Sequence, residues 1–202
     1  MAVLRIGCLA WGSLLWDPRT LQRAGVFRAD GPRLPIEFSR VALDGRVTLV
    51  LDPFAEVIQT YWVLLAVNSL DDAVRDLGVR EKITPEKWSS WIGLLSSGDR
   101  VENGESANSG FRRPIADWLA LQELDAVVWT ALPPRMPDGE ARHPNCEVLL
   151  AHLKSLEGEA RRRAEEYIRR APAAVRTLNR ARFESELGEA FKMESGTGRS
   201  LQ

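Results

Sequence analysis

Hydrophobic residues open the chain in a nearly unbroken run. Residues 3–10 are mostly apolar, a pattern typical of a strand that is buried on both faces. A small polar pair, Gly12-Ser13, follows directly and lies between Trp11 and Trp16. A glycine at a strand end lets a ligand approach the main chain, whose freed N–H groups can bind a carboxylate or carbonyl oxygen. The same residues fit an ordinary turn flanked by core tryptophans, so both interpretations stay open.

Later segments rich in β-branched and aromatic residues predict further strands. The dipeptide Asp44-Gly45 is typical of a two-residue hairpin turn. The expected strands are residues 35–43 and 46–53, joined by that turn, then residues 57–67, and finally residues 124–132.

Apolar positions spaced three or four residues apart predict helices between and after these strands. Ser69 suits the N-terminal cap of one helix and Gly78 its end, while Thr84 with Pro85 begins another. The expected helices cover residues 17–25, 70–78, 84–95, 113–122, 146–170 and 173–191, with loops at 96–110 and 133–145.

Strands thus occupy mainly the first two thirds of the chain and helices its end, an order that favours an α+β fold. The length of 202 residues suits one compact domain with an appendage. We expect a domain over residues 1–145, a helical extension packed on it over residues 146–192, and a flexible tail over residues 193–202.

Charge and composition limit the partners. The net charge is −1, so no global field attracts nucleic acid or an anionic membrane. The arginines of residues 161–170 are moderated by glutamates in and beside that run, and they fit a solvated helix face better than a nucleic-acid contact. No apolar segment approaches the roughly 20 residues that span a bilayer, and nothing resembles a signal peptide. We therefore expect a cytoplasmic protein, with its oligomeric state left open.

Metal and thiol chemistry find little support. His143, Cys146 and His152 lie within ten residues, but their spacing fits no strong zinc pattern and a fourth ligand is missing. Cys8 and Cys146 are the only cysteines, and neither has an obvious paired base. We expect no metal and no cofactor.

A second polar landmark follows the helix that Ser69 begins. Arg80, Glu81 and Lys82 come just after Gly78 in the stretch "DLGVREKI". Such a triplet is most often solvated. A carboxylate directly after a tight turn can instead point into a pocket formed by the strand ends.

The two landmarks together carry a resemblance to a known family. "WGSLLWDP", residues 11–18, is similar to the "YGSLIWNP" signature of the ChaC-type gamma-glutamylcyclotransferases and to the shorter "YGSL" of the wider gamma-glutamylcyclotransferase-like superfamily. "SLDDAVRDLGVREK", residues 69–82, resembles the ChaC-type helix that ends in "LDxREK". The hairpin of residues 35–53 occupies the place of the family's "FSRxSxDHRGTP…TLV". The resemblance covers residues 4–83.

What this resemblance implies is a small mixed β-barrel with flanking helices, here with extra C-terminal helices. It further implies an enzyme that releases 5-oxoproline from a gamma-glutamyl compound, such as glutathione, by attack of the substrate's own α-amine. Glu81 would be the catalytic general acid/base. The main chain of Trp11, Gly12, Ser13 and Leu14 would hold the gamma-glutamyl group.

Other polar residues near these motifs are less clearly assigned. Arg40 and Ser39, on the hairpin, are candidate substrate contacts. Arg80 fits either a clamp for the substrate's carboxylate or a solvated neighbour of Glu81, and the opposite directions of adjacent residues in an extended segment favour the latter.

The sequence also departs from the family pattern. Trp11 replaces the family's tyrosine, which keeps an aromatic wall but loses a phenolic hydroxyl. Ile83-Thr84 replaces a glycine-tyrosine pair, and the hairpin loop is shorter. These changes concern substrate identity more than the fold. A non-catalytic module that binds a small molecule or another protein on the same scaffold is the alternative.

Overall fold

The computed structural model describes residues 4–99, 109–188 and 191. Its strands are β1 (Ile6–Ala10), β2 (Arg33–Val41), β3 (Val47–Leu51), β4 (Val57–Gln59), β5 (Tyr61–Leu64), β6 (Ile92–Ser96) and β7 (Ala126–Thr130). Its α-helices are α1 (Leu70–Arg80), α2 (Trp88–Trp91), α3 (Ser109–Leu119), α4 (Cys146–Ser155), α5 (Gly158–Arg170) and α6 (Leu178–Leu187), with short 3-10 helices at Ser13–Leu15 and Pro85–Lys87.

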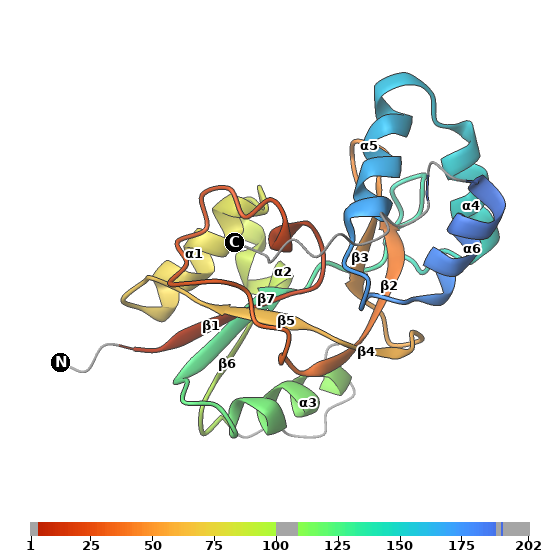
Figure 1. The fold of residues 1–202 in the computed structure, drawn as a ribbon. Coiled ribbons are helices and arrows are strands. Elements are labelled where there is room, and N and C mark those ends of the chain that lie inside the picture. The colour runs from red at the N-terminus through yellow and green to blue at the C-terminus, as the bar shows by residue number, and fades with distance from the viewer. Residues whose placement is uncertain (1–3, 100–108, 189–190, 192–202) are drawn as a thin grey trace.

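The expected α+β class and the extra C-terminal helices are confirmed. The strands form two sheets, and no closed barrel is found among the described residues. Figure 1 shows α4, α5 and α6 gathered beside β2 and β3, while α1 and α3 lie at the sheet that contains β1.

The first sheet has the strand order β5-β1-β7-β6, with β1 parallel to β7 and antiparallel to β5. All five residues of β1 are buried because helices cover both sheet faces. Cys8 belongs to an apolar cluster with Leu77 of α1, whereas Leu9 belongs to another with Ile115 of α3. The continuous apolar run at the start of the sequence is therefore a strand buried on both faces, as predicted.

The second sheet has the order β3-β2-β4, with both pairs antiparallel. The predicted hairpin is present, but five residues, 42–46, connect its strands instead of two. The Ala42 N–H donates to Arg46 O at 2.8 Å and closes the loop. Gly45 takes a φ of 85°, which is why glycine stands at this position.

The run predicted as one strand over residues 57–67 is divided between the two sheets. β4 pairs with β2, and β5 pairs with β1. Thr60 lies at the division, fully buried, and its hydroxyl donates to Pro32 O. The apolar pattern of the sequence cannot reveal that the two halves pair with different strands, because both halves are typical of a strand.

Two predicted helices are wrong because other parts of the chain satisfy their backbone. Residues 17–25 form turns, and the Gln22 N–H donates to the Asp76 carboxylate at 2.8 Å. In the segment 84–95, helix α2 gives way to β6. There Gly93 faces its cross-strand partner Trp129, and a Cβ at Gly93 would lie 2.0 Å from the indole.

The helix predicted over residues 146–170 is two helices, α4 and α5, separated at Leu156 and Glu157. Gly158 begins α5 with a φ of 53°. One apolar cluster combines Phe38 of β2 with Leu149 of α4 and Phe183 of α6, so the C-terminal helices share a core with the second sheet. The tail expected over residues 193–202 lies outside the described residues, as does most of the predicted 96–110 loop. Among the described helices, none is long and apolar enough to cross a bilayer.

Helix α1 begins as predicted but does not end at Gly78. The Ser69 hydroxyl accepts a hydrogen bond from the Asp72 N–H at 3.1 Å, and the helix continues to Arg80. Gly78 instead allows a close approach of Trp88, because a Cβ there would lie 2.3 Å from the indole Nε1. The indole N–H itself donates to Ile83 O at 2.9 Å. The glycine therefore serves tertiary packing.

We predict that Gly78→Ala lowers the free energy of unfolding by about 1–3 kcal/mol, because the added methyl group must displace the Trp88 indole. Urea denaturation followed by circular dichroism measures the change. Gly110→Ala in α3 is the matched control, since nothing lies within 4 Å of its added Cβ. The control should be neutral or slightly stabilising, and a Gly78→Ala variant of wild-type stability would contradict this packing.

Candidate functional site

A cavity of about 340 Å³ lies where the end of β1, the β2–β3 hairpin and the end of α1 meet. It brings together all six residues named by the sequence motifs: Trp11, Gly12, Ser13, Leu14, Arg40 and Glu81. Tyr167 of α5 also lines it, so the C-terminal extension contributes to the wall. Ser39, a further candidate, does not line the cavity; it is fully buried in the hairpin.

The loop after β1 is a single 3-10 turn. The Leu15 N–H donates to Gly12 O at 3.0 Å, and the Asp17 N–H donates to Ser13 O at 2.8 Å. A Cβ at Gly12 would lie 2.6 Å from the Tyr167 hydroxyl oxygen, so only glycine fits beneath that phenol. No helix follows at Pro18, and helical potential there contributes nothing to anion binding.

The end of α1 places Glu81 at the cavity through a Schellman motif. The Ile83 N–H donates to Gly78 O at 2.9 Å, and the Lys82 N–H donates to Val79 O at 3.1 Å. Lys82 has a φ of 56°, a left-handed conformation that usually calls for glycine. A non-glycine residue there costs about 1–2 kcal/mol, and this strain lies next to the candidate catalytic carboxylate.

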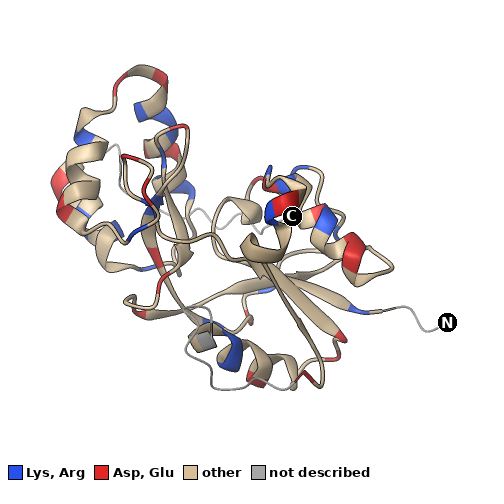
Figure 2. Cartoon of the chain, turned by 180° about the vertical axis from the view of Figure 1, so that it is seen from behind, with Lys and Arg blue, Asp and Glu red and all other residues tan. Residues whose placement is uncertain are grey.

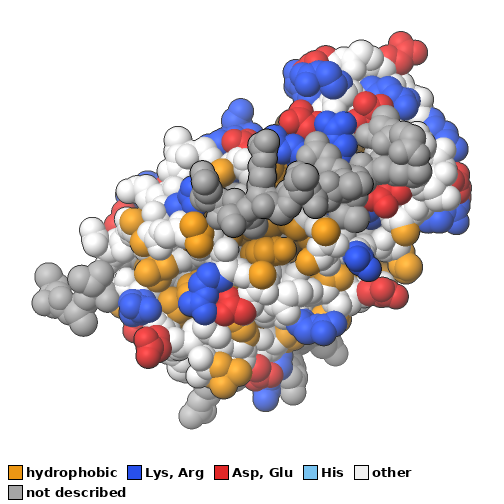
Figure 3. All heavy atoms as spheres, in the orientation of Figure 1, with side chains coloured by type: hydrophobic (Ala, Val, Ile, Leu, Met, Phe, Trp, Pro, Cys, Tyr) orange, Lys and Arg blue, Asp and Glu red, His pale blue; other side chains and the backbone are white. Residues whose placement is uncertain are grey.

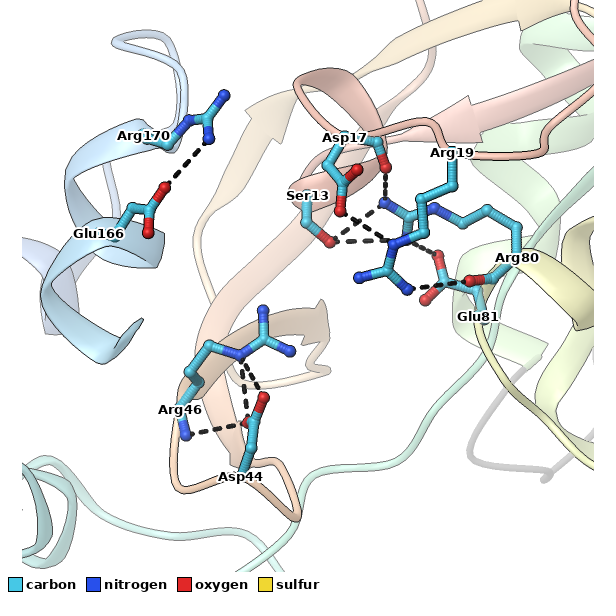
Figure 4. Close-up of polar contacts among 9 residues, drawn as sticks. All are labelled: Ser13, Asp17, Arg19, Asp44, Arg46, Arg80, Glu81, Glu166 and Arg170. Atoms are coloured by element: carbon cyan, nitrogen blue, oxygen red, sulfur yellow. Dashed lines mark hydrogen bonds and ion pairs between the residues drawn. The ribbon is translucent and has the colours of Figure 1, made fainter. Parts of the chain in front are cut away.

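Arg80 is buried, with a side chain only 2% exposed, so its assignment as a solvated neighbour is wrong. The expectation assumed an extended segment, but Arg80 is the last residue of a helix. Its guanidinium donates to Glu81 Oε1 at 2.6 Å, to Ser13 Oγ at 3.4 Å and to Asp17 O (Figure 4). One cation therefore joins the loop after β1 to the end of α1.

Glu81 is partly withdrawn from solvent, with a side chain 19% exposed. The contact with Arg80 uses Oε1, which leaves Oε2 as the oxygen free to meet a ligand. The arrangement suits a carboxylate that accepts a proton inside the cavity.

The sequence motifs do not reveal Tyr167, which lies far along the chain on an amphipathic helix. Its hydroxyl accepts the Leu49 N–H at 3.4 Å. Burial raises the pKa of Tyr167, while the main-chain N–H groups of Leu49 and Ser13 act in the opposite direction. The group is a neutral phenol at physiological pH and can donate its own proton. It supplies a phenolic hydroxyl beside Trp11, where the resemblance led us to expect none.

Outside this cavity, the residues considered for metal and thiol chemistry are dispersed. His143 Nε2 lies 2.6 Å from Asp52 Oδ2, while His152 Nε2 lies 2.7 Å from Gly45 O. No group of three or more potential metal ligands occurs among the described residues. Burial raises the pKa of the Cys8 thiol well above its usual range, so it stays protonated.

Four arginines of α5, at positions 161, 162, 163 and 170, form ion pairs within their own helix. Arg162 and Arg163 both contact Glu159, and Arg170 contacts Glu166. Figure 2 shows basic and acidic segments intermixed on the C-terminal helices, and Figure 3 shows both signs crowded on that part of the surface. The face seen there carries no extended patch of one sign.

Comparisons of the chain with protein-family models, with curated proteins and with solved structures found no match. The chemistry of the cavity residues is therefore what supports a function.

We predict that Arg80→Lys lowers the free energy of unfolding by about 1–3 kcal/mol, because an ammonium cannot reach three acceptors as the planar guanidinium does. Arg75→Lys, on the same helix, is the control, since Arg75 is exposed and meets only Asp72. Urea denaturation of both variants tests the difference. Equal stabilities would show that the Arg80 contacts do not hold the site together.

Tyr167→Phe should preserve the fold and cost about 1 kcal/mol, the usual net value of one hydrogen bond. The ring contacts remain, including the edge contact with Trp16 at 5.3 Å between ring centroids. Thermal unfolding measures this change. A loss of stability much larger than one hydrogen bond would contradict this expectation.

Proposed function

We propose that the chain is a gamma-glutamylcyclotransferase-like enzyme that releases 5-oxoproline from a gamma-glutamyl compound. The single observation that carries the proposal is that the Glu81 carboxylate and the loop of residues 11–14 line one cavity. Two motifs that lie about 70 residues apart in the sequence thus meet in space, as a shared substrate would require.

The reaction is intramolecular, so the protein must fold the substrate and move protons. Glu81 Oε2 accepts a proton from the substrate's α-ammonium, and the freed amine attacks the gamma-carbonyl carbon. A C–N bond forms and closes the five-membered ring. Glu81 returns this proton to the leaving nitrogen as the bond between that nitrogen and the carbonyl carbon breaks. Glu81 then takes the second proton, which the ring nitrogen loses, and passes it to the released amine. The protons lost by the attacking nitrogen end on the leaving nitrogen, so neither water nor a cofactor is consumed.

The ring closure puts negative charge on the carbonyl oxygen, which needs hydrogen-bond donors. The main-chain N–H groups of Gly12 and Leu14 and the Tyr167 hydroxyl, all on residues that line this end of the cavity, would be the donors. Loss of one such donor in other enzymes costs about 3 kcal/mol of transition-state stabilisation. A buried phenol that accepts hydrogen bonds from main-chain N–H groups is also a better hydrogen-bond donor, because hydrogen bonds in a chain polarise one another.

The buried ion pair gives the general base a fixed position. Arg80 holds Oε1 and also contacts Ser13, so the base and the loop keep a constant separation. General acid/base groups typically contribute about 100-fold to 10,000-fold to the rate. Most of the remaining acceleration would come from holding the flexible gamma-glutamyl chain in its cyclising conformation.

The test is release of 5-oxoproline from glutathione, gamma-glutamyl dipeptides and gamma-glutamylamines. Glu81→Gln should lower kcat by about 100-fold or more, because the amide cannot accept the proton. Glu86→Gln is the control, an exposed glutamate five residues on that does not line the cavity. A folded wild type without turnover on any of the three substrate types would overturn the proposal and favour a non-catalytic binding module. Equal activity of Glu81→Gln and wild type would remove Glu81 from the mechanism.

A further inference from the structure

Two guanidinium groups face the same cavity from neighbouring backbone segments. Arg40 of β2 and Arg135 of the loop after β7 form a parallel bridge. The Val41 N–H donates to Arg135 O at 3.0 Å, and the Arg135 N–H donates to Ser39 O at 3.1 Å. Residues opposed in this way project their side chains on the same side. Both arginines line the cavity beside Glu81.

An irregularity in β2 directs Arg40 there. Phe38 pairs with Leu49, but Arg40 pairs with Thr48, so Ser39 is an extra residue in the strand. Because Leu49 and Thr48 are adjacent, they face opposite sides of the sheet, and so do Phe38 and Arg40. Without the bulge, Arg40 would share the core side with Phe38. The strand is thus built to present a guanidinium to the cavity.

Neither guanidinium has an acidic partner within residues 4–99, 109–188 and 191. Arg40 donates to Pro133 O at 2.6 Å and lies over the Trp91 ring. Arg135 donates to the carbonyls of Gly139 and Val41 at 3.2 and 3.5 Å. In the described part of the chain, no carboxylate lies within ion-pair distance of either. Burial, and secondly the charge of Arg135, lower the pKa of Arg40 to about 10.

Like charges placed directly opposite each other destabilise a sheet. Most other arginines near the site are neutralised locally, as Arg46 is by Asp44 and Arg80 is by Glu81. The repulsion between Arg40 and Arg135 is therefore not offset by an acidic group among the described residues at this cavity wall. A bound anion would offset it, and a planar carboxylate matches the fork of a guanidinium.

We propose that Arg40 and Arg135 form a carboxylate-binding subsite that recognises the α-carboxylate of an amino-acid headgroup. Glu81 lines the same cavity and would bind the α-ammonium. Glu81 thus supplies a negative group and the two arginines supply positive groups, which suit the opposite charges of a zwitterion. The identity of the ligand as a gamma-glutamyl headgroup rests on the proposed function. The subsite itself does not, because carboxylate binding requires no turnover.

Isothermal titration with two small probes tests the subsite. The probes are 5-oxoproline, which carries the carboxylate, and 2-pyrrolidinone, the same ring without it. Wild type should bind 5-oxoproline at least about tenfold more tightly than 2-pyrrolidinone. Arg135→Gln should lose most of that preference while its affinity for 2-pyrrolidinone stays unchanged. Arg33→Gln, at the start of the same strand and outside the cavity, should behave as wild type.

Two further readouts separate recognition from folding. Arg135→Gln should unfold at the wild-type temperature or above it, because it removes a like-charge contact. Arg135→Lys keeps the positive charge but loses the two parallel donors of the guanidinium, so it should show only part of the wild-type preference for 5-oxoproline. This variant tests the subsite even if Arg135→Gln fails to fold. Inorganic phosphate should bind less tightly than 5-oxoproline, and tighter phosphate binding would replace the carboxylate assignment.

The outcomes distinguish this inference from the proposed function. If Arg135→Gln does not affect turnover and wild type binds the two probes equally, the subsite is overturned but the proposed enzymatic function still stands. Carboxylate-selective binding that depends on Arg135, without turnover on any gamma-glutamyl compound, supports the subsite and overturns the enzyme. Failure of wild type to bind either probe overturns the subsite.

Discussion

The contact of Arg80 with Ser13, Asp17 and Glu81 is the interaction on which the site depends. A buried cation is stable only when surrounding acceptors replace its lost hydration. Arg80 takes those acceptors from the loop after β1 and from the residue that follows α1. Its need for acceptors therefore holds together two segments that both line the candidate site.

A second constraint acts on the same loop from the C-terminal helices. Tyr167 of α5 lies against Gly12 and receives the Leu49 N–H from β3. Three segments are thus in contact around one phenol. The extension is part of the cavity wall and shares the apolar core of the second sheet. A boundary drawn near residue 145 divides the sequence but does not divide the core.

The local elements of this fold could largely be predicted from the sequence. The run at β1, the cap at Ser69 and the hairpin around Gly45 each depend on neighbouring residues, and each is present. Predictions failed where a distant contact decided the conformation. Gly78 continues a helix because Trp88 packs on it, and Gly93 belongs to a strand because Trp129 covers it.

The candidate site shows the same division between local and distant information. Its motif residues, Glu81 and the loop of residues 11–14, could be named in advance because short patterns carry them. Arg135 and Tyr167 could not, since each lies in a segment whose pattern reads as an ordinary loop or helix. Only the folded chain brings them to the cavity. The predicted exposure of Arg80 was also wrong, because adjacent side chains point in different directions in a helix and in an extended segment.

The place of Tyr167 in the chain has a consequence for biosynthesis. A nascent protein emerges from its N-terminus, and its early segments begin to fold first. Both sheets and the acidic group of the cavity are complete well before residue 167 is made. The pocket therefore acquires its phenol only after α5 has been made and has packed against the second sheet. The cavity wall would thus be completed by this helix rather than by the strands and their connecting loops, which supply most of its other lining residues.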